Sequence, residues 1–202
     1  MDDRESVRSL DGGLAFSRPL QVNSVSGSVI ATGAVRGAQI AAGTGGRVHV
    51  AWNGSRSTAP GATPMFYTRL NEAGTAFEPQ RNVMHDAYNI DGGGTVAADR
   101  IGRVYVAWHA KAPGQHEEGK RRVWIARSAD DGGTFDRERP VFDEPTGACG
   151  CCGLGAFAER HGSVFMLFRS AFEIMNRDIR VLSKCHRSGG LERFSNRRGA
   201  SL

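Results

Sequence analysis

Long apolar runs are missing from this chain of 202 residues, and none reaches the length that spans a bilayer. The first ten residues, MDDRESVRSL, also lack the basic segment and apolar stretch of a signal peptide. No membrane span is therefore expected. The location stays open: cytoplasmic if the sequence starts at the true N-terminus, and secreted or periplasmic if it does not.

Concentrated charge is scarce as well. The formal net charge is +5 and the pI is about 9.4, but the basic residues are scattered apart from Lys120-Arg121-Arg122 and a basic tail. The sequence has no basic helix and no recognisable nucleic-acid-binding module, so nucleic acid is not an expected partner. The run Lys120-Arg121-Arg122 is interpreted as a solvated loop end.

Cysteine is rare, and helical periodicity is absent. Only four cysteines occur, three of them within residues 149–152, which is not the pattern of a disulfide-stapled secreted domain. Glycine, by contrast, is abundant, with 27 residues at turn-like positions along the chain. Many tight turns without helical periodicity favour an all-β fold.

Three segments repeat with a period near 60 residues. Each places a glycine before an alternating strand that ends in an aromatic residue: GGRVHVAWNG (45–54), IGRVYVAWHA (101–110) and HGSVFMLFRS (161–170). A short strand of small residues precedes each of them, and a further strand follows each, at 65–70, 122–128 and 178–184. Self-similarity at a fixed period is typical of repeat architectures.

The turns that follow these strands share the period. Phe16, Phe77, Phe135 and Phe194 close them, spaced 61, 58 and 59 residues apart. A repeated unit of four short strands is a propeller blade. The sequence therefore predicts an all-β, β-propeller fold of four-stranded antiparallel blades, with about three and a half blades present. The expected divisions are a half-blade at 1–19, blades at about 20–77, 78–135 and 136–194, and an unstructured tail at 195–202.

The stretch SADDGGTF (128–135) matches the Asp-box motif, through Ser128, Asp130, Gly132, Thr134 and Phe135. A degenerate copy at 9–16 keeps Ser9, Asp11, Gly13 and Phe16. The aspartate is expected to accept N–H bonds of the turn, the glycine to supply the backbone conformation, and the phenylalanine to close the sheet edge. These residues are therefore predicted to be structural.

With this motif and period, the chain resembles the sialidase-like (BNR/Asp-box) β-propellers, which include exo-alpha-sialidases. The resemblance covers nearly the whole chain and implies a ring of six blades, of which this chain would be a part. It also implies that the Asp-box hairpins join the third and fourth strands of a blade. The active site would lie on the opposite face, among the loops that join strand 4 to strand 1 and strand 2 to strand 3.

The resemblance also implies the residue types of a sialidase site. An arginine cluster would hold a substrate carboxylate, because the guanidinium fork pairs with it bidentately; the candidates are Arg36, Arg169 and Arg177. A tyrosine nucleophile would be activated by a nearby carboxylate; the candidates are Tyr88 with Asp86, Asp91 or Glu173. The F/Y-R-I-P motif of family sialidases is absent, and Ser17-Arg18-Pro19 does not replace it.

Other roles remain open for these residues. Arg36 and Arg169 could form surface or inter-blade ion pairs, and Tyr88, Asp86 and Asp91 could serve loop packing and turn hydrogen bonds. Two functions therefore stand side by side. One is a glycoside hydrolase of sialidase type that acts on terminal acidic sugars of glycans. The other is a non-catalytic propeller that binds glycan or protein through its loop face.

The stretch Cys149-Gly150-Cys151-Cys152 allows three interpretations. Cys149, Cys151 and Cys152 could offer thiolates to a soft metal, with His85 or His109 close by. They could form a strained and labile disulfide, or they could be small buried thiols beneath the loop face. The metal is not the favoured alternative, so no cofactor is expected.

The expected partners are a glycan or a small acidic sugar. An open arc of blades would also expose sheet faces at both ends. Three interpretations are open: the chain is a gene fragment, its C-terminus carries a frame error, or self-association closes the ring.

Overall fold

The computed structural model describes residues 4–30, 35–55, 63–88, 90–142, 147–160, 162–171, 178–184 and 195–198. In these segments the chain is all β, with two short 3-10 turns, η1 (Thr44–Gly46) and η3 (Glu118–Lys120), and no α-helix. None of the described helical turns has the length and apolar character that a membrane-spanning helix needs.

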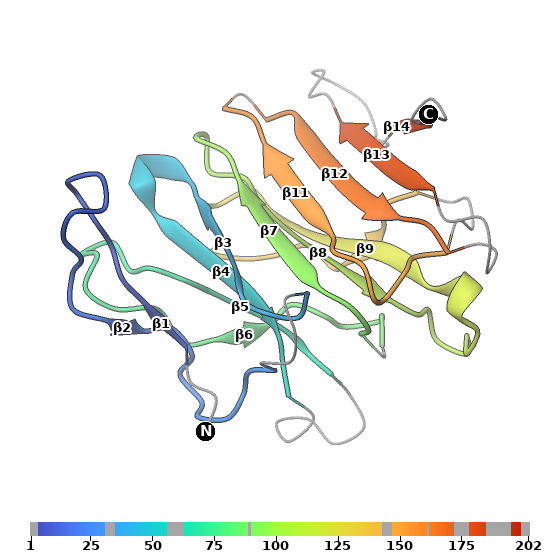
Figure 1. Cartoon of the computed structure of the whole chain (residues 1–202), viewed down its shortest axis with the longest axis horizontal. Coiled ribbons are helices and arrows are strands. Elements are labelled where there is room, and N and C mark those ends of the chain that lie inside the picture. The colour runs from blue at the N-terminus through green and yellow to red at the C-terminus, as the bar shows by residue number, and fades with distance from the viewer. Residues whose placement is uncertain are drawn as a thin grey trace.

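The strands form one two-stranded sheet and three four-stranded sheets, each antiparallel and built from consecutive strands (Figure 1). The N-terminal sheet pairs β1 (Glu5–Ser6) with β2 (Leu20–Gln21). Blade one contains β3 (Gln39–Ala42), β4 (Val48–Asn53), β5 (Met65–Arg69) and β6 (Arg81–Asn82). Blade two contains β7 (Gly94–Ala98), β8 (Val104–Ala110), β9 (Arg122–Ser128) and β10 (Arg139–Pro140). Blade three contains β11 (Gly155–Ala158), β12 (Val164–Arg169), β13 (Ile179–Lys184) and β14 (Ser195–Arg198).

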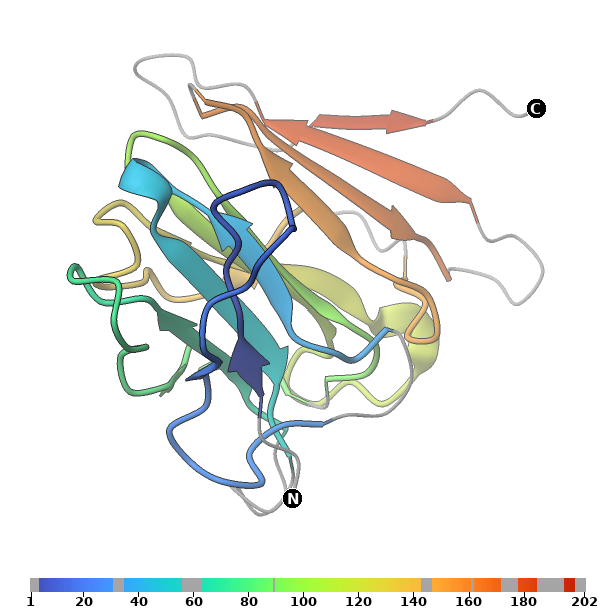
Figure 2. The same cartoon turned by 60° about the vertical axis from the view of Figure 1, so that its left-hand side comes forward.

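The three blades lie face to face, with their first strands β3, β7 and β11 beside one another (Figure 1 and Figure 2). One apolar layer separates blades one and two, and a second separates blades two and three. This is the arrangement of blades in a β-propeller, so the predicted fold class is confirmed. The ring of six blades that the resemblance implies stays a prediction.

Strand β8 explains the alternation seen in the repeated segments. All seven of its residues are buried. Val106 and Trp108 belong to the layer shared with blade one, whereas Tyr105 and Ala107 belong to the layer shared with blade three. A strand inside a stack of sheets has no solvent side. The alternation in β8 therefore separates two apolar layers rather than core from solvent.

The predicted divisions of the chain are wrong at the fourth strands. β6, β10 and β14 lie beyond the expected boundaries at 77, 135 and 194, and each pairs with the third strand of the blade before it. β14 also contradicts the unstructured tail expected from residue 195, and β2 extends the N-terminal unit beyond residue 19. Because β2, β6 and β10 are only two residues long, they carry no periodicity that a sequence can reveal.

The hairpin at 128–135 has the predicted hydrogen bonds. Ser128 Oγ donates to Asp130 Oδ1 over 2.7 Å, and Asp130 Oδ1 also accepts the Thr134 amide over 2.8 Å. Gly132 adopts a φ of 81° and donates its amide to Ser128 Oγ. The Thr134 amide first, and then the Ser128 hydroxyl, lower the pKa of Asp130 to about 2. Phe135 packs against the layer between blades one and two, so the hairpin is structural.

Two degenerate hairpins contain equivalent hydrogen bonds. Ser9 Oγ donates to Asp11 Oδ1 over 2.7 Å, and Asp11 Oδ1 accepts the Ala15 amide over 3.0 Å. Between β5 and β6, Asn71 Oδ1 accepts the Thr75 amide over 2.9 Å, the counterpart of the Asp130 bond. Asn71 thus replaces the aspartate of the motif, because an amide oxygen can accept the same turn N–H.

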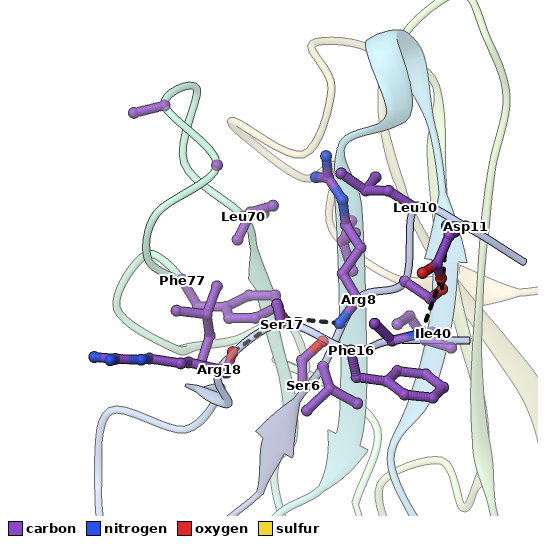
Figure 3. A pocket seen from close by; sticks show the side chains of 17 residues that line it. Ser6, Arg8, Leu10, Asp11, Phe16, Ser17, Arg18, Ile40, Leu70 and Phe77 are labelled. Atoms are coloured by element: carbon purple, nitrogen blue, oxygen red, sulfur yellow. Dashed lines mark hydrogen bonds between the residues drawn. The ribbon is translucent and has the colours of Figure 1, made fainter. Parts of the chain in front are cut away.

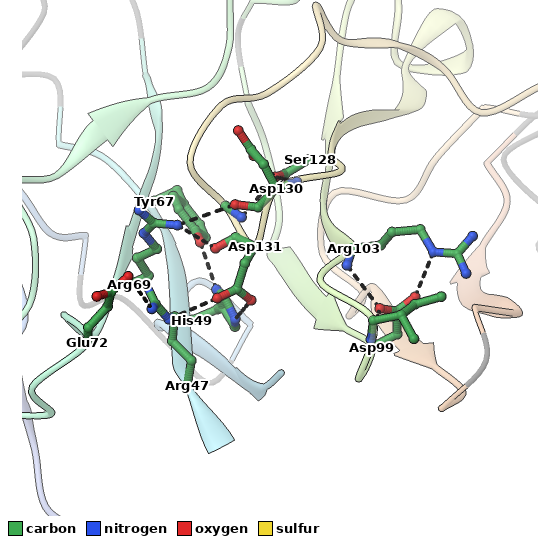
Figure 4. Close-up of polar contacts among 12 residues, drawn as sticks. Arg47, His49, Tyr67, Arg69, Glu72, Asp99, Arg103, Ser128, Asp130 and Asp131 are labelled. Atoms are coloured by element: carbon green, nitrogen blue, oxygen red, sulfur yellow. Dashed lines mark hydrogen bonds and ion pairs between the residues drawn. The ribbon is translucent and has the colours of Figure 1, made fainter. Parts of the chain in front are cut away.

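Asp131 fastens the 128–135 hairpin to blade one (Figure 4). Its carboxylate lies 2.8 Å from Arg47 Nε and 3.5 Å from His49 Nε2, and its carbonyl accepts from Arg69 over 2.8 Å. His49 is fully buried, with Nδ1 2.7 Å from the Tyr67 hydroxyl. Burial, more than any charge, lowers the pKa of His49 to about 4. The histidine is therefore neutral at pH 7 and serves as an inter-blade polar contact.

Candidate functional site

The connections between strands lie at two opposite ends of the stack. The hairpins described above occupy one end, here called the hairpin face. The other end, the loop face, carries the segments before the first strands (35–38, 90–93 and 147–154) and the segment after β8 (111–121). Antiparallel pairing brings these connections to the same end. The sequence predicts that the site lies on this face.

Glycines let three of these loops touch. The Asn53 side chain donates to the Gly92 carbonyl over 2.5 Å. A Cβ on Gly92 would lie 2.5 Å from the Gly150 carbonyl oxygen, and one on Gly93 would collide with the Val35 carbonyl. Gly92 also has a φ of 92°, which favours glycine. The segments that lead into three consecutive blades therefore meet backbone to backbone.

An arginine–aspartate–arginine cluster lies at this junction. Asp91 Oδ1 accepts from Arg36 over 2.7 Å, and Asp91 Oδ2 accepts from Arg121 over 3.0 Å. The Arg121 side chain is 5% exposed and also donates to the Ala148 carbonyl over 3.1 Å. Arg36 and Asp91 are each 40% exposed. The cluster thus combines one buried guanidinium, one shared carboxylate and one guanidinium that solvent reaches.

The structure brings together two of the predicted site residues, Arg36 and Asp91. It adds Arg121, which the sequence did not single out. The interpretation of Lys120-Arg121-Arg122 as a solvated loop end is wrong for Arg121, because this residue turns inward to Asp91 just before β9 begins. The available signal was its position, at a strand end on the same face as the 90–93 loop.

The other predicted residues of the 83–93 loop have different partners. The Tyr88 hydroxyl donates to the Gln115 carbonyl over 2.5 Å. Asp86 forms an ion pair with Arg137, whose Nε lies 2.5 Å from Oδ2. The expected pairing of Tyr88 with Asp86 or Asp91 is not formed, because arginines take both carboxylates.

Arg169 lies at the end of β12 and contacts the cysteine turn. Its Nη1 is 3.6 Å from Cys152 Sγ, and its carbonyl accepts the Cys149 amide over 2.9 Å. The end of blade three therefore holds both ends of the turn. Arg177 and Glu173, the remaining predicted site residues, lie outside the described residues.

The sulfur atoms of the turn gather at one point. Cys149 Sγ lies 3.0 Å from Cys151 Sγ, which lies 3.9 Å from Cys152 Sγ, and all three are within 4.8 Å of one another. Cys149 is buried, Cys152 is half-buried and Cys151 is exposed, so packing as buried thiols does not describe Cys151. Contact with its neighbours, Cys149 first, raises the pKa of the Cys151 thiol. Within the described segments neither His85 nor His109 joins the group.

His109 is buried close to the arginine–aspartate cluster. Its carbonyl accepts the Asp91 amide over 3.3 Å, and in the described structure neither ring nitrogen has a hydrogen-bond partner. Burial first, and then the charge of Arg121, lower the pKa of His109 to about 4. The ring is therefore neutral at pH 7, and it packs against Phe168 in a T-shaped contact.

A separate open groove of about 860 Å³ lies between the N-terminal sheet and blade one (Figure 3). Its walls are mainly apolar and include Phe16, Ile40 and Phe77. Phe16 is 63% exposed, so the expectation that it closes its sheet edge as Phe135 does is wrong. Of the predicted catalytic residues that the structure describes, none lines the groove. The arginine–aspartate cluster remains the candidate site.

No protein-family model matches the chain, and no curated protein matches its sequence. Several solved structures are similar to it. A protein of unknown function from Dyadobacter fermentans is 10% identical, with a TM-score of 0.49 over 80% of this chain and 54% of its own. A Trypanosoma rangeli sialidase in complex with sialic acid is 9% identical, with a TM-score of 0.48 over 90% of this chain and 32% of its own. A fucose lectin from Kordia zhangzhouensis is 11% identical, with a TM-score of 0.47 over 82% of this chain and 99% of its own.

The chain spans about half the length of the Dyadobacter protein and about a third of the sialidase. Similarity at this level says nothing of the chemistry of a site. The function is therefore argued from the residues of the loop face alone.

Proposed function

We propose that the loop face binds a carboxylated sugar at the end of a glycan, with Arg36 as its main contact for the carboxylate. The observation that carries this proposal is the cluster of Arg36, Asp91 and Arg121. A guanidinium pairs with a carboxylate through two parallel hydrogen bonds. Arg36 leaves 40% of its side chain open to such a ligand.

Asp91 prepares Arg36 for this role. One carboxylate oxygen holds Arg36, and the other is held by the buried Arg121. The guanidinium is thereby fixed before a ligand arrives, which reduces the entropy lost on binding. The glycine contacts at 92, 93 and 150 keep the loops that carry these residues together.

Binding without turnover agrees better with the described contacts than hydrolysis does. A tyrosine nucleophile needs a base within hydrogen-bond reach. Tyr88 donates to a backbone carbonyl instead, and both oxygens of Asp91 are taken by arginines. Sialidase-type hydrolysis, which the sequence resemblance implies, stays a prediction that the same experiment tests.

The test compares N-acetylneuraminic acid with its methyl ester, which has the same ring but no negative charge. Titration calorimetry on the full chain should show at least tenfold weaker binding of the ester. Arg36→Ala should weaken binding of the acid by about tenfold, equivalent to about 1.4 kcal/mol. Arg100→Ala is the matched control, because Arg100 is an exposed arginine on the hairpin face.

Equal binding of acid and ester, or equal losses in the two variants, would refute the proposal. A fluorogenic sialoside is assayed in parallel. Turnover that Arg36→Ala abolishes would establish hydrolysis and overturn the conclusion that the face only binds.

A further inference from the structure

The turn at 149–152 is a cluster of three thiols that neither the fold nor the proposed sugar site explains. Its sulfur atoms lie within 4.8 Å of one another. The Cys152 amide donates to the Cys149 carbonyl over 3.3 Å, and the Cys149 amide donates to the Arg169 carbonyl. Backbone hydrogen bonds thus close the turn and fasten it to the end of β12.

The turn is also held from the side of blade two. A Cβ on Gly150 would lie 2.7 Å from Asp91 Oδ2 and 3.1 Å from Arg121 Nη1. Arg121 additionally donates to the Ala148 carbonyl. A glycine between the first two cysteines therefore lets the turn pack closely against blade two, and this packing sets the direction of the three side chains.

The arrangement of the sulfurs favours a ligand set over the two alternatives. A disulfide between Cys149 and Cys151 would leave Cys152 unused, and a bond between residues so close in sequence is strained. Simple packing does not account for an exposed Cys151 beside a buried Cys149. Three sulfurs that converge and open to solvent on one side can instead receive an ion from solution.

Positive charge lies close to the cluster. Arg169 Nη1 lies 3.6 Å from Cys152 Sγ. Arg121 lies on the other side of the turn, against the Ala148 carbonyl. Both charges offset part of the negative charge of three thiolates around one cation.

We propose that Cys149, Cys151 and Cys152 form a three-thiolate site for a soft metal cation, Cu(I). Soft sulfur ligands select Cu(I) and Zn²⁺ among the common metals. Structural zinc takes four protein ligands, and within the described segments no histidine, aspartate or glutamate joins the three sulfurs. A set of three sulfurs suits Cu(I) better. Binding would replace the three thiol protons by one cation.

The test titrates Cu(I) into the reduced full chain without oxygen, against a chromophoric Cu(I) chelator. One equivalent should bind, and X-ray absorption should show sulfur alone around the copper. Cys151→Ser should weaken binding at least tenfold, and because Cys151 is exposed this variant should keep the melting temperature of the parent. Cys185→Ser, which removes the one cysteine outside the stretch 149–152 of the sequence, is the matched control and should bind as the parent does.

Three outcomes would overturn the proposal. They are Cu(I) uptake that Cys151→Ser does not change, tight binding of Zn²⁺ with no uptake of Cu(I), and a Cys149–Cys151 disulfide that persists in reductant. None of these readouts involves a sugar, so failure here is separate from failure of the proposed carbohydrate site.

Discussion

At the residue scale, Gly132 and Gly13 occupy the same position in two hairpins but have different surroundings. Both adopt a positive φ, 81° and 94°. A Cβ on Gly132 would collide with the Tyr67 hydroxyl of blade one, whereas a Cβ on Gly13 meets nothing within 4 Å. Comparing the two positions therefore separates backbone strain from packing between blades.

Gly13→Ala should cost about 1 kcal/mol of unfolding free energy, because a side chain in the left-handed region is strained. Gly132→Ala should cost a further 1 to 3 kcal/mol or so, because its methyl group overpacks the contact with Tyr67. Urea unfolding followed by tryptophan fluorescence measures both variants. Equal losses would show that Tyr67 moves aside at no cost and that the hairpin does not depend on this contact.

Acid should weaken the fold through two buried histidines. The pKa values of His49 and His109 are lowered from 6.5 to about 4, in both cases chiefly by burial. Between pH 6.5 and pH 4 the unfolded chain therefore binds protons that the folded chain does not. Stability should be complete above about pH 6.5 and should fall as the pH falls toward 4. Each histidine contributes a loss on the order of 1 to 3 kcal/mol at pH 4.

Unfolding free energies measured from pH 7.5 to pH 4.5 check this expectation. His109→Leu replaces one titrating ring by a side chain of similar volume. This variant should reduce the slope of the unfolding free energy against pH, and the remaining slope should come from His49. His116→Gln is the control, because His116 is exposed and should leave the slope unchanged. A slope that His109→Leu does not alter would assign the acid sensitivity to other groups.

At the scale of elements, one buried carboxylate organises the loop that leads toward β7. Glu138 Oε1 accepts the amides of His85, Asp86 and Ala87 over 2.6, 2.6 and 3.0 Å. Glu138 is only 4% exposed. The residues just before β10 thus satisfy backbone donors of the loop that carries Tyr88, and the shape of this part of the loop face depends on them.

Glu138→Ala should destabilise the chain by about 3 kcal/mol, because three backbone amides, of which that of Ala87 is buried, lose a charged acceptor. Hydrogen exchange of the amides at 85–87 should accelerate more than exchange in β8. Glu117→Ala removes an exposed glutamate of a neighbouring loop and should change neither quantity. Unchanged protection at 85–87 in Glu138→Ala would show that water replaces the carboxylate.

The long strands could be predicted from the sequence, and the short ones could not. β4, β8 and β12 alternate over six or seven residues, and this pattern repeats with the period of the blades. β6 and β10 contain two residues each, so only the neighbouring third strand defines them. For this reason the predicted blade boundaries fall one strand too early.

The candidate site, too, could be predicted only in part from the sequence. Arg36 and Asp91 could be selected because strand order places their loops on one face. Arg121 shares this kind of position, but its burial could not be predicted, because it depends on Asp91 and on the Ala148 carbonyl, contacts that exist only once the blades stack. Tyr88 was selected for its chemistry alone, and the hydrogen bond from its hydroxyl to the Gln115 carbonyl could not be predicted from the sequence.

At the scale of the whole molecule, each blade covers one apolar face of the next, and in the described part of the chain no sheet packs on the outer face of blade three. On blade three, Val164, Met166 and Phe168 belong to the layer shared with blade two. The other face of the same sheet presents Phe157 and Leu167, which are 64% and 49% exposed. Exposed apolar patches of this kind mark interaction surfaces.

The opposite end of the stack offers a matching surface. The groove beside the N-terminal sheet exposes Leu10, Phe16 and Ile40, at 85%, 63% and 63%. We predict that two copies of the chain associate with the open face of blade three in one copy against this groove in the other. Such a contact joins different surfaces of the two copies and repeats the blade-on-blade packing found within the chain.

Light scattering at increasing concentration should therefore give a mass above the 21.7 kDa of one chain. Leu167→Lys places a charge in the open face of blade three and should shift the mass toward that of one chain, because a lysine buried in an apolar contact has no partner. Ile101→Lys is the control: Ile101 is 57% exposed on the hairpin face, outside both surfaces. A single-chain mass at every concentration, or equal effects of the two substitutions, would refute this assembly and leave both apolar faces free for a different protein.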